Sequence, residues 1–143
     1  MQAYDPDGDG EENDDQVRSA LADQNPATNW TTVCYQETLM GKSGVGLVVT
    51  LSHAATGELS FDVDNPPFQV EVFGSDAEQI PSRFDGWGPA LQNKTASDVA
   101  APVTVATPVP VRHLLIVLRE IGRDRGCSGA NPNRGSIGEI SFG

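Results

Sequence analysis

Three aspartates at alternate positions near the start of the chain raise the question of calcium binding. Asp5, Asp7 and Asp9 match the first half of an EF-hand loop, and the glycine needed for its sharp turn follows them. The position that closes such a loop holds Gln16, whose neutral amide cannot supply a bidentate carboxylate. No room is left before Asp5 for the preceding helix. The pattern therefore favours an acidic stretch in which Pro, Gly and Asp form tight turns.

A turn rich in glycine and aromatic residues, RFDGWGP, is a second candidate site. Phe84 and Trp87 could form an exposed platform there, because aromatic rings stack on the apolar faces of sugar rings. The alternative is that these rings fold back under their own loop. We take Arg83, Phe84 and Trp87 as the candidate ligand-binding residues. Trp30, at the start of an expected strand, is instead predicted to be a core anchor.

Side chains that could perform catalysis are present, but no motif positions them. His113 begins an apolar strand-like run, and His53 follows another, so we expect a strand-end histidine and an exposed turn residue. The chain has no G-x-S-x-G nucleophile elbow. The GKSG stretch at Gly41 lacks the spacing of a phosphate-binding loop and is expected to be a plain loop or hairpin. The sequence gives no positive sign of an enzyme.

The two cysteines, Cys34 and Cys127, lie in the loop-like surroundings TTVCYQ and DRGCSGANPN. They do not have the C-x-x-C spacing of a zinc or redox site. One disulfide, closing a loop of about ninety residues, is favoured over two free thiols. Such a bond implies an oxidising, extracytoplasmic location.

Length and charge limit the classes of protein to be considered. The 143 residues suffice for one domain with an ordinary core. The net charge is -11, and no basic footprint exists for nucleic acid, which is therefore not an expected partner. The longest purely apolar run, LLIVL, is too short to span a bilayer. The chain is either a cytosolic protein or a domain cut from a longer protein. The cysteines favour a domain of a longer protein, and Met1 is then an artificial start.

Most of the chain has strand character, and turn formers such as ATG, DNPP, GSD and GANPNRG separate the strands. The strand-like runs are residues 44–52, 58–63, 67–74, 103–120 and 136–142. One short helical turn is expected, in which Asp14 or Asp15 caps a face formed by Val17, Ala20 and Leu21. This pattern predicts a single all-β domain over 1–143, an antiparallel β-sandwich of the jelly-roll kind, with an acidic N-terminal segment over residues 1–13.

Five stretches in order resemble one known module: YDPDGDGEEN, ALADQNPATNWTT, GKSGVGLVVTLS, VRHLLIVLRE and GSIGEISF. They resemble the discoidin-like, galactose-binding-like jelly roll at the C-terminus of actinobacterial MviN/MurJ-type lipid II flippases, and the mycobacterial member most. In that family a cytoplasmic pseudokinase-like domain and one transmembrane helix precede this extracytoplasmic module. The resemblance implies that the acidic segment is the stretch that leads into the β-sandwich in this family. It also implies that only the parent protein's transmembrane segments contact the membrane.

The broader discoidin fold often holds one structural metal ion in an A-x-D-G-[DN]-x-x-T-x-W loop, closed by a glutamate of the last strand. The resemblance places Asp23, Thr28 and Glu139 at the matching positions. Gln24 stands where glycine would let a carbonyl turn inward, and Arg134 could neutralise Glu139 instead of a metal. We therefore predict no calcium at this site and no other cofactor.

The resemblance implies a non-catalytic extracytoplasmic binding module of a lipid II flippase, which recognises a cell-wall saccharide, the lipid II head group or a cell-wall protein. The alternatives are a structural or protein-interaction domain without a sugar site, and a secreted hydrolase. We also expect Arg123 and Arg125, brought near by the disulfide, to pair weakly with carboxylates of the acidic N-terminal segment.

Overall fold

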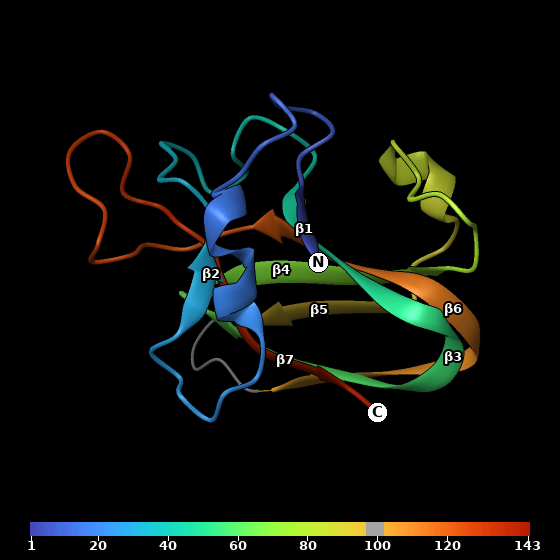
Figure 1. The fold of residues 1–143 in the computed structure, drawn as a ribbon. Helices are drawn as coiled ribbons and strands as arrows, with labels where there is room; N and C mark the ends of the chain where they lie inside the picture. The colour runs from blue at the N-terminus through green and yellow to red at the C-terminus, as the bar shows by residue number, and fades with distance from the viewer. Residues whose placement is uncertain (97–101) are drawn as a thin grey trace.

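The computed structural model describes residues 1–96 and 102–143, and for 94–96 it describes the backbone only. The elements are, in chain order, β1 (Gln2–Tyr4), η1 (Asp14–Ala20), β2 (Asn29–Thr31), β3 (Val45–Asp64), β4 (Phe68–Ser75), η2 (Phe84–Trp87), β5 (Gln92–Ala96), β6 (Val103–Glu120) and β7 (Ser136–Phe142). Both η elements are 3-10 helices. The strands pair antiparallel in the order β2-β7-β3-β6-β4-β5, with β1 on β3 (Figure 1). The predicted all-β jelly-roll sandwich is confirmed.

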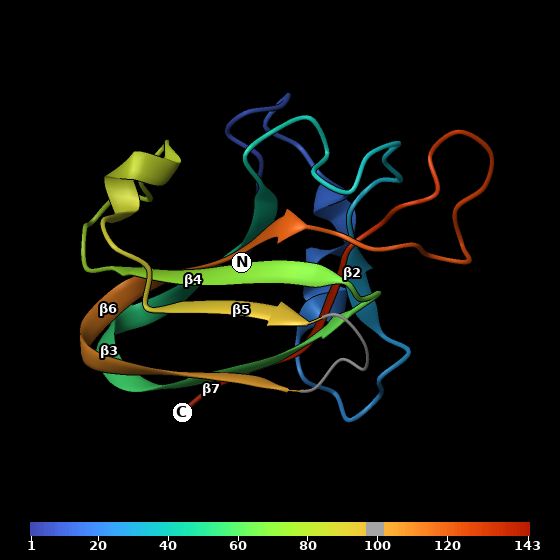
Figure 2. The same cartoon turned by 180° about the vertical axis from the view of Figure 1, so that it is seen from behind.

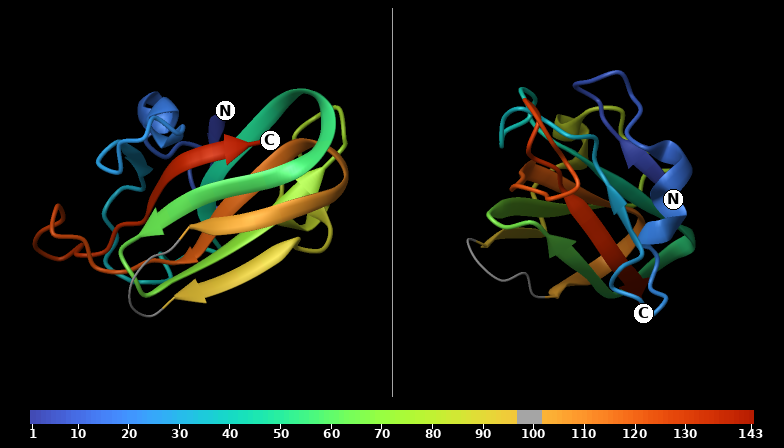
Figure 3. Two further views of the ribbon diagram at one scale, coloured as in Figure 1. Left: turned by 90° about the horizontal axis from the view of Figure 1, so that it is seen from below. Right: turned by 90° about the vertical axis from the view of Figure 1, so that its left-hand side faces the viewer.

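Two long, bent strands make the sandwich. β3 has 20 residues and β6 has 18. The first part of β3 pairs with β1 and the end of β6, whereas its second part pairs with the start of β6 and with β7. Their register shifts between Thr50 and Gly57, where both strands curl round together (Figures 2 and 3). Bulges bend strands without ending them. The ATG stretch, predicted as a turn between two strands, therefore lies inside one strand.

The main core lies between the two layers. Alternate residues of β4, Phe68, Val70 and Val72, are buried as the sequence pattern predicts. Trp30 is fully buried among them, so its predicted role as a core anchor is confirmed. Burial of each large apolar side chain contributes roughly 1.5–3 kcal/mol.

A second apolar cluster covers the outer face of one layer. Tyr4, Val48, Phe73 and Leu115 form it together with Trp87. Trp87 comes from the connection between β4 and β5 that contains η2 (Figure 1). This connection covers the outer face, so β4 is buried on both sides near its end.

The predicted helical turn is present as η1, and it buries Val17 and Ala20. Leu21 is 46% exposed, because it leaves the helix and forms a bridge with Ile140. The predicted aspartate cap is wrong: the N-cap residue is Asn13, in the left-handed conformation and without a side-chain cap bond.

The strands approach closely at Gly46, which pairs with Tyr4 on one side and Val117 on the other. A Cβ at this position would overlap the carbonyl oxygen of Ile116, so only glycine fits. This contact explains the second glycine of the GVGL run.

Three loops gather at one end of the sandwich, namely the acidic N-terminal segment, residues 32–44 and residues 121–135 (Figures 1 and 3). Over the described parts of the chain, no helix combines the length and the apolar composition needed to cross a bilayer.

Candidate functional site

A disulfide joins two of the three loops. Cys34 and Cys127 are bonded at an S–S distance of 2.02 Å, with 5.9 Å between their Cα atoms, so the predicted pairing is confirmed. Next to it the backbones of Tyr35 and Asn133 exchange hydrogen bonds, and Asn133 Nδ2 donates to the carbonyl of Gln36 over 3.1 Å. The 32–44 loop is therefore fixed covalently and by hydrogen bonds to the 121–135 loop.

The core fixes the acidic N-terminal segment beside the same loop. Trp30 Nε1 donates to the carbonyl of Glu12 over 2.9 Å, and Asn13 Nδ2 donates to the carbonyl of Thr31 over 2.8 Å. Because Trp30 is fully buried, it holds its partner to a rigid part of the molecule. Residues 12 and 13 consequently form a fixed wall opposite the 32–44 loop.

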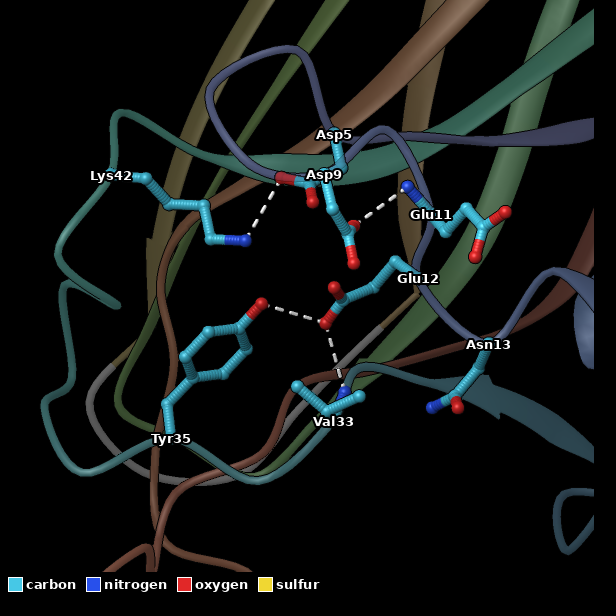
Figure 4. Close-up of a pocket in the computed structure, with 8 residues that line it drawn as sticks. All are labelled: Asp5, Asp9, Glu11, Glu12, Asn13, Val33, Tyr35 and Lys42. Carbon is cyan, nitrogen blue, oxygen red and sulfur yellow. Dashed lines mark hydrogen bonds and ion pairs between the residues drawn. The ribbon is translucent and has the colours of Figure 1, made fainter.

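A cavity of about 490 Å³ lies between these walls (Figure 4). We call it the acidic cavity, and its lining residues are Asp5, Asp9, Glu11, Glu12, Asn13, Val33, Tyr35 and Lys42. The lining residues carry four carboxylates and one ammonium group, and the cavity has the size that small-molecule sites usually have.

The three alternating aspartates turn to separate partners. Asp5 is buried and forms a 2.9 Å ion pair with Lys42. Asp7 accepts hydrogen bonds from the hydroxyl and the N–H of Ser43, and these bonds lower its pKa. Asp9 accepts the N–H two residues further on, over 2.9 Å. The N–H of Gly8 donates to the carbonyl of Asp5 over 3.2 Å, so the segment forms a tight turn as predicted.

Glu12 is a buried carboxylate with only 4% of its surface exposed. Its Oε1 accepts the N–H of Val33 over 2.9 Å and the hydroxyl of Tyr35 over 2.8 Å. Its Oε2 accepts no hydrogen bond from a described residue and points into the acidic cavity (Figure 4). Burial raises the pKa of Glu12, and the bonds from Val33 and Tyr35 oppose that rise only in part.

Lys42 and Tyr35 lie on the opposite side of the cavity, with Nζ 5.0 Å from the centre of the phenol ring. Burial raises the pKa of Tyr35 to about 12; Lys42 opposes this rise and Glu12 adds to it. Burial lowers the pKa of Lys42, but Tyr35 and Asp5 raise it more, so the net change is upward. At neutral pH the cavity therefore presents a charged ammonium group and an uncharged phenol.

Of the candidate platform residues, Trp87 is not exposed. The residue is 4% exposed, and its Nε1 donates to the hydroxyl of Tyr4 over 3.0 Å. The idea of an exposed Trp87 face is wrong, because the loop folds over a sheet face that carries Val48 and Phe73 and needs a large ring to cover it.

Arg83 and Phe84 line a second hollow, which we call the Arg83 hollow. It is formed by Pro6, Asp7, Ser43, Arg83, Phe84 and Asp85. Phe84 is half-buried, and the Arg119 guanidinium carbon lies 4.5 Å from its ring centre. Arg83 is exposed and 3.7 Å from Asp85, an ion pair worth little in water. Ligand binding by Arg83 and Phe84 stays a prediction.

The structure brings together the residues proposed for a metal loop. The Glu139 carboxylate accepts the N–H groups of Gln24 and Asn25, each over 3.2 Å, and Asp23 accepts the N–H of Asn25 over 2.9 Å. This last bond, followed by bonds with Glu139 and Thr28, lowers the pKa of Asp23. Gln24 has a φ of 61°, so the expectation that it would avoid glycine's conformation is wrong.

Arg134 does not reach Glu139 as expected, because its Nε donates to Asp124 over 2.9 Å. In residues 1–96 and 102–143, no three His, Cys, Asp or Glu side chains are placed to hold a metal ion. The absence of calcium stays a prediction.

The expected pairing of Arg123 and Arg125 with the acidic N-terminal segment is wrong. Both arginines are exposed, and neither forms an ion pair with any residue in the described part of the chain. The cationic partner of the acidic N-terminal segment is Lys42 of the 32–44 loop, which pairs with Asp5.

The histidines lie away from the cavities. His113 is buried within β6, rather than at a strand end, with Nδ1 3.0 Å from Thr50 Oγ1. His53 is exposed, as predicted, but it lies in β3 rather than in a turn. Neither lines the acidic cavity or the Arg83 hollow.

Comparison with solved structures shows that this sandwich is similar in fold to two adhesin domains. The K1 cleaved adhesin domain of Lys-gingipain from Porphyromonas gingivalis W83 aligns with a TM-score of 0.61 at 13% identity, over 99% of this chain and 89% of that one. The K2 cleaved adhesin domain of Lys-gingipain gives a TM-score of 0.59 at 16% identity, over 99% and 87%. A mutant of a family 29 carbohydrate-binding module reaches only 0.48 at 14% identity, over 81% and 71%. No protein-family model and no curated protein matches the sequence.

Sequence reasoning missed the three residues that define the acidic cavity. In the sequence Glu12 is one of several acids in the N-terminal segment, Tyr35 is the neighbour of a cysteine, and Lys42 is part of GKSG. No sequence spacing indicates this grouping, because the disulfide fixes the loop bearing Tyr35 and Lys42 only to the 121–135 loop.

Proposed function

We propose that this chain is a non-catalytic, extracytoplasmic binding module that holds a saccharide in the acidic cavity. The observation that carries the proposal is the fixed set of polar groups there: the Oε2 atom of Glu12 and the ammonium group of Lys42 face a cavity whose walls are held by Trp30 and the disulfide. Fixed groups lose little conformational entropy when a ligand binds.

Two further observations support this function. The gingipain neighbours are named adhesin domains, so the same fold serves attachment in another protein. The disulfide between Cys34 and Cys127 suits an oxidising space outside the cytoplasm. The fold by itself does not assign a function, so the cavity remains the principal support.

We further propose that the module belongs to an actinobacterial MviN/MurJ-type lipid II flippase. The sequence resemblance from Tyr4 to Phe142 supports this parent. The ligand would then be a cell-wall glycan or the head group of lipid II, and the parent's transmembrane segments would provide the membrane attachment.

A protein-interaction domain is the second candidate function. Val33 and Leu39, both on the 32–44 loop, are 44% and 57% exposed, and such side chains suit a protein contact. A secreted hydrolase has no comparable support from the described residues.

Titration of the isotope-labelled protein with cell-wall saccharides, followed by the amide signals in NMR spectra, tests the proposal. We expect the signals of Glu12, Val33 and Lys42 to shift. The change Val33→Arg should block binding by filling the mouth of the cavity. The matched control is Val109→Arg, because Val109 is also exposed but lies on β6 outside the cavity.

Shifts that persist in Val33→Arg and vanish in a variant of the Arg83 hollow would move the site there. If no saccharide shifts any signal at millimolar concentration, the sugar-binding proposal fails. Capture of a cell-wall protein that sugars do not compete away would then support the interaction domain.

A further inference from the structure

We infer that the acidic cavity prefers a saccharide that carries a free primary amino group, and that Glu12 selects it. The inference rests on the proposed saccharide binding and names the class of sugar. Its basis is a charge imbalance in the cavity and the position of one unbonded oxygen on the buried Glu12 side chain.

The charges that line the cavity do not balance. Lys42, the one cation among the described lining residues, is paired with Asp5. Asp9, Glu11 and Glu12 form no ion pair with any residue of the described chain. Uncompensated carboxylates attract an ammonium group and repel a phosphate or a carboxylate. The cavity therefore favours a cationic ligand group over an anionic one, and of the two ligands proposed above this selects a cell-wall glycan with free amines rather than the phosphate-bearing head group of lipid II.

Glu12 provides an independent indication of the same ligand group. Its side chain is buried, and both bonds to Oε1 come from uncharged donors, the N–H of Val33 and the hydroxyl of Tyr35. Oε2 points into the cavity without a bonding partner among the described residues (Figure 4). A buried carboxylate without a counter-ion is unfavourable. A ligand ammonium group would donate to Oε2 and neutralise this charge.

Hydroxyl groups on the same sugar ring would complete the contacts. Asp9 can accept a hydroxyl hydrogen, and Lys42 can donate to a ring oxygen or hydroxyl, since both line the cavity. Acetylation of the amine removes its charge. The N-acetyl sugar therefore keeps the hydroxyl contacts with Asp9 and Lys42 but cannot form an ion pair with Glu12. The unmodified amine is thus the feature that the cavity distinguishes.

Calorimetric titration with glucosamine, N-acetylglucosamine and glucose at neutral pH and low salt tests the inference. We expect glucosamine to bind at least about tenfold more tightly than the other two, because hydrogen bonds between charged groups are stronger than neutral ones. The change Glu12→Gln should abolish the preference, since glutamine keeps an oxygen for Val33 and Tyr35 but presents an amide to the cavity. Glu58→Gln is the matched control, because Glu58 is exposed on β3 and does not line the cavity.

A second variant, Asp9→Asn, keeps the test decisive if Glu12→Gln does not fold. Asp9 is exposed, and asparagine can still accept the hydrogen bond that it receives, so the preference should shrink without loss of the fold. Glucose binding as tightly as glucosamine would overturn the inference and leave saccharide binding intact. Failure of all three sugars would overturn the inference, and the absence of any amide shift with the cell-wall saccharides as well would overturn the proposed function itself. Binding of Nα-acetyl-lysine amide as tight as that of glucosamine would also overturn the inference, by showing recognition of an amine without a sugar.

Discussion

The indole N–H of Trp30 donates to the backbone carbonyl of Glu12 over 2.9 Å and joins the wall of a surface cavity to the centre of the hydrophobic core. Trp30 is fully buried, whereas the side chain of Glu12 faces the acidic cavity. The rigidity of the cavity therefore depends on core packing as well as on its own hydrogen bonds.

Trp30→Phe tests this connection. Phenylalanine retains an apolar ring but leaves the Glu12 carbonyl without its donor, so we expect a loss of about 2–3 kcal/mol in the free energy of unfolding. Urea denaturation measures the loss, and NMR should show broadened or shifted amide signals for residues 12 and 13. Trp87→Phe serves as the control, since it removes the bond to Tyr4 and should leave those signals unchanged. Unchanged signals in Trp30→Phe would show that the bond does not order the cavity.

Loss of the disulfide should destabilise the whole fold. Cys34 and Cys127 are 93 residues apart, and closing a loop of this length is worth about 4.6 kcal/mol in the chain-entropy model, with engineered examples often giving less. The double change of both cysteines to alanine should lower the free energy of unfolding by a similar amount as reduction of the unmodified protein. Mass spectrometry of unreduced peptides should show the two segments linked. Two alkylatable thiols in the folded, oxidised protein would contradict the bond.

Tyr35 should make stability depend on alkaline pH. Burial raises its pKa to about 12, so the folded state holds the phenol proton more tightly than the unfolded chain, whose tyrosine ionises near pH 10. The stabilisation is complete below about pH 10 and is lost as the pH rises through about 12. Chemical denaturation at a series of alkaline pH values should show that Tyr35→Phe reduces this loss. An identical pH dependence in both proteins would mean that Tyr35 ionises normally.

Calcium should not stabilise the domain. Both the Glu139 and the Asp23 carboxylates already accept backbone N–H groups from the loop between them, namely those of Gln24 and Asn25. We expect the same melting temperature with calcium and with a chelator, and the same response from Glu139→Gln. A calcium-dependent rise in melting temperature that Glu139→Gln abolishes would restore the metal.

Local patterns predicted several elements because short-range physics determines them. The alternation of Phe68, Val70 and Val72 follows from the two-residue period of a strand, and one face of β4 is buried accordingly. Val17 and Ala20 indicated the helical turn by their spacing alone. The disulfide was predictable because oxidation pairs the only two cysteines of a chain.

Long-range packing decided the features that these patterns could not. The ATG stretch has the composition of a turn, but pairing with β6 keeps it inside a bent strand. Trp87 has an exposed-looking context, yet a sheet face more than ten residues away in sequence buries it. Neither outcome follows from neighbouring residues, because strand partners and covering loops come from distant parts of the chain.

The sequence by itself determined the sandwich, its core anchor Trp30 and the bond between Cys34 and Cys127, since each depends on residue type and local period. Only the tertiary structure decided that Glu12 and Lys42, thirty residues apart, line one cavity. The physical reason is that the burial and the hydrogen bonds of a carboxylate depend on residues that are near it in space and distant from it in sequence. The Trp30 anchor and the disulfide bring together a buried acid, a phenol and an ammonium group that no sequence spacing connects.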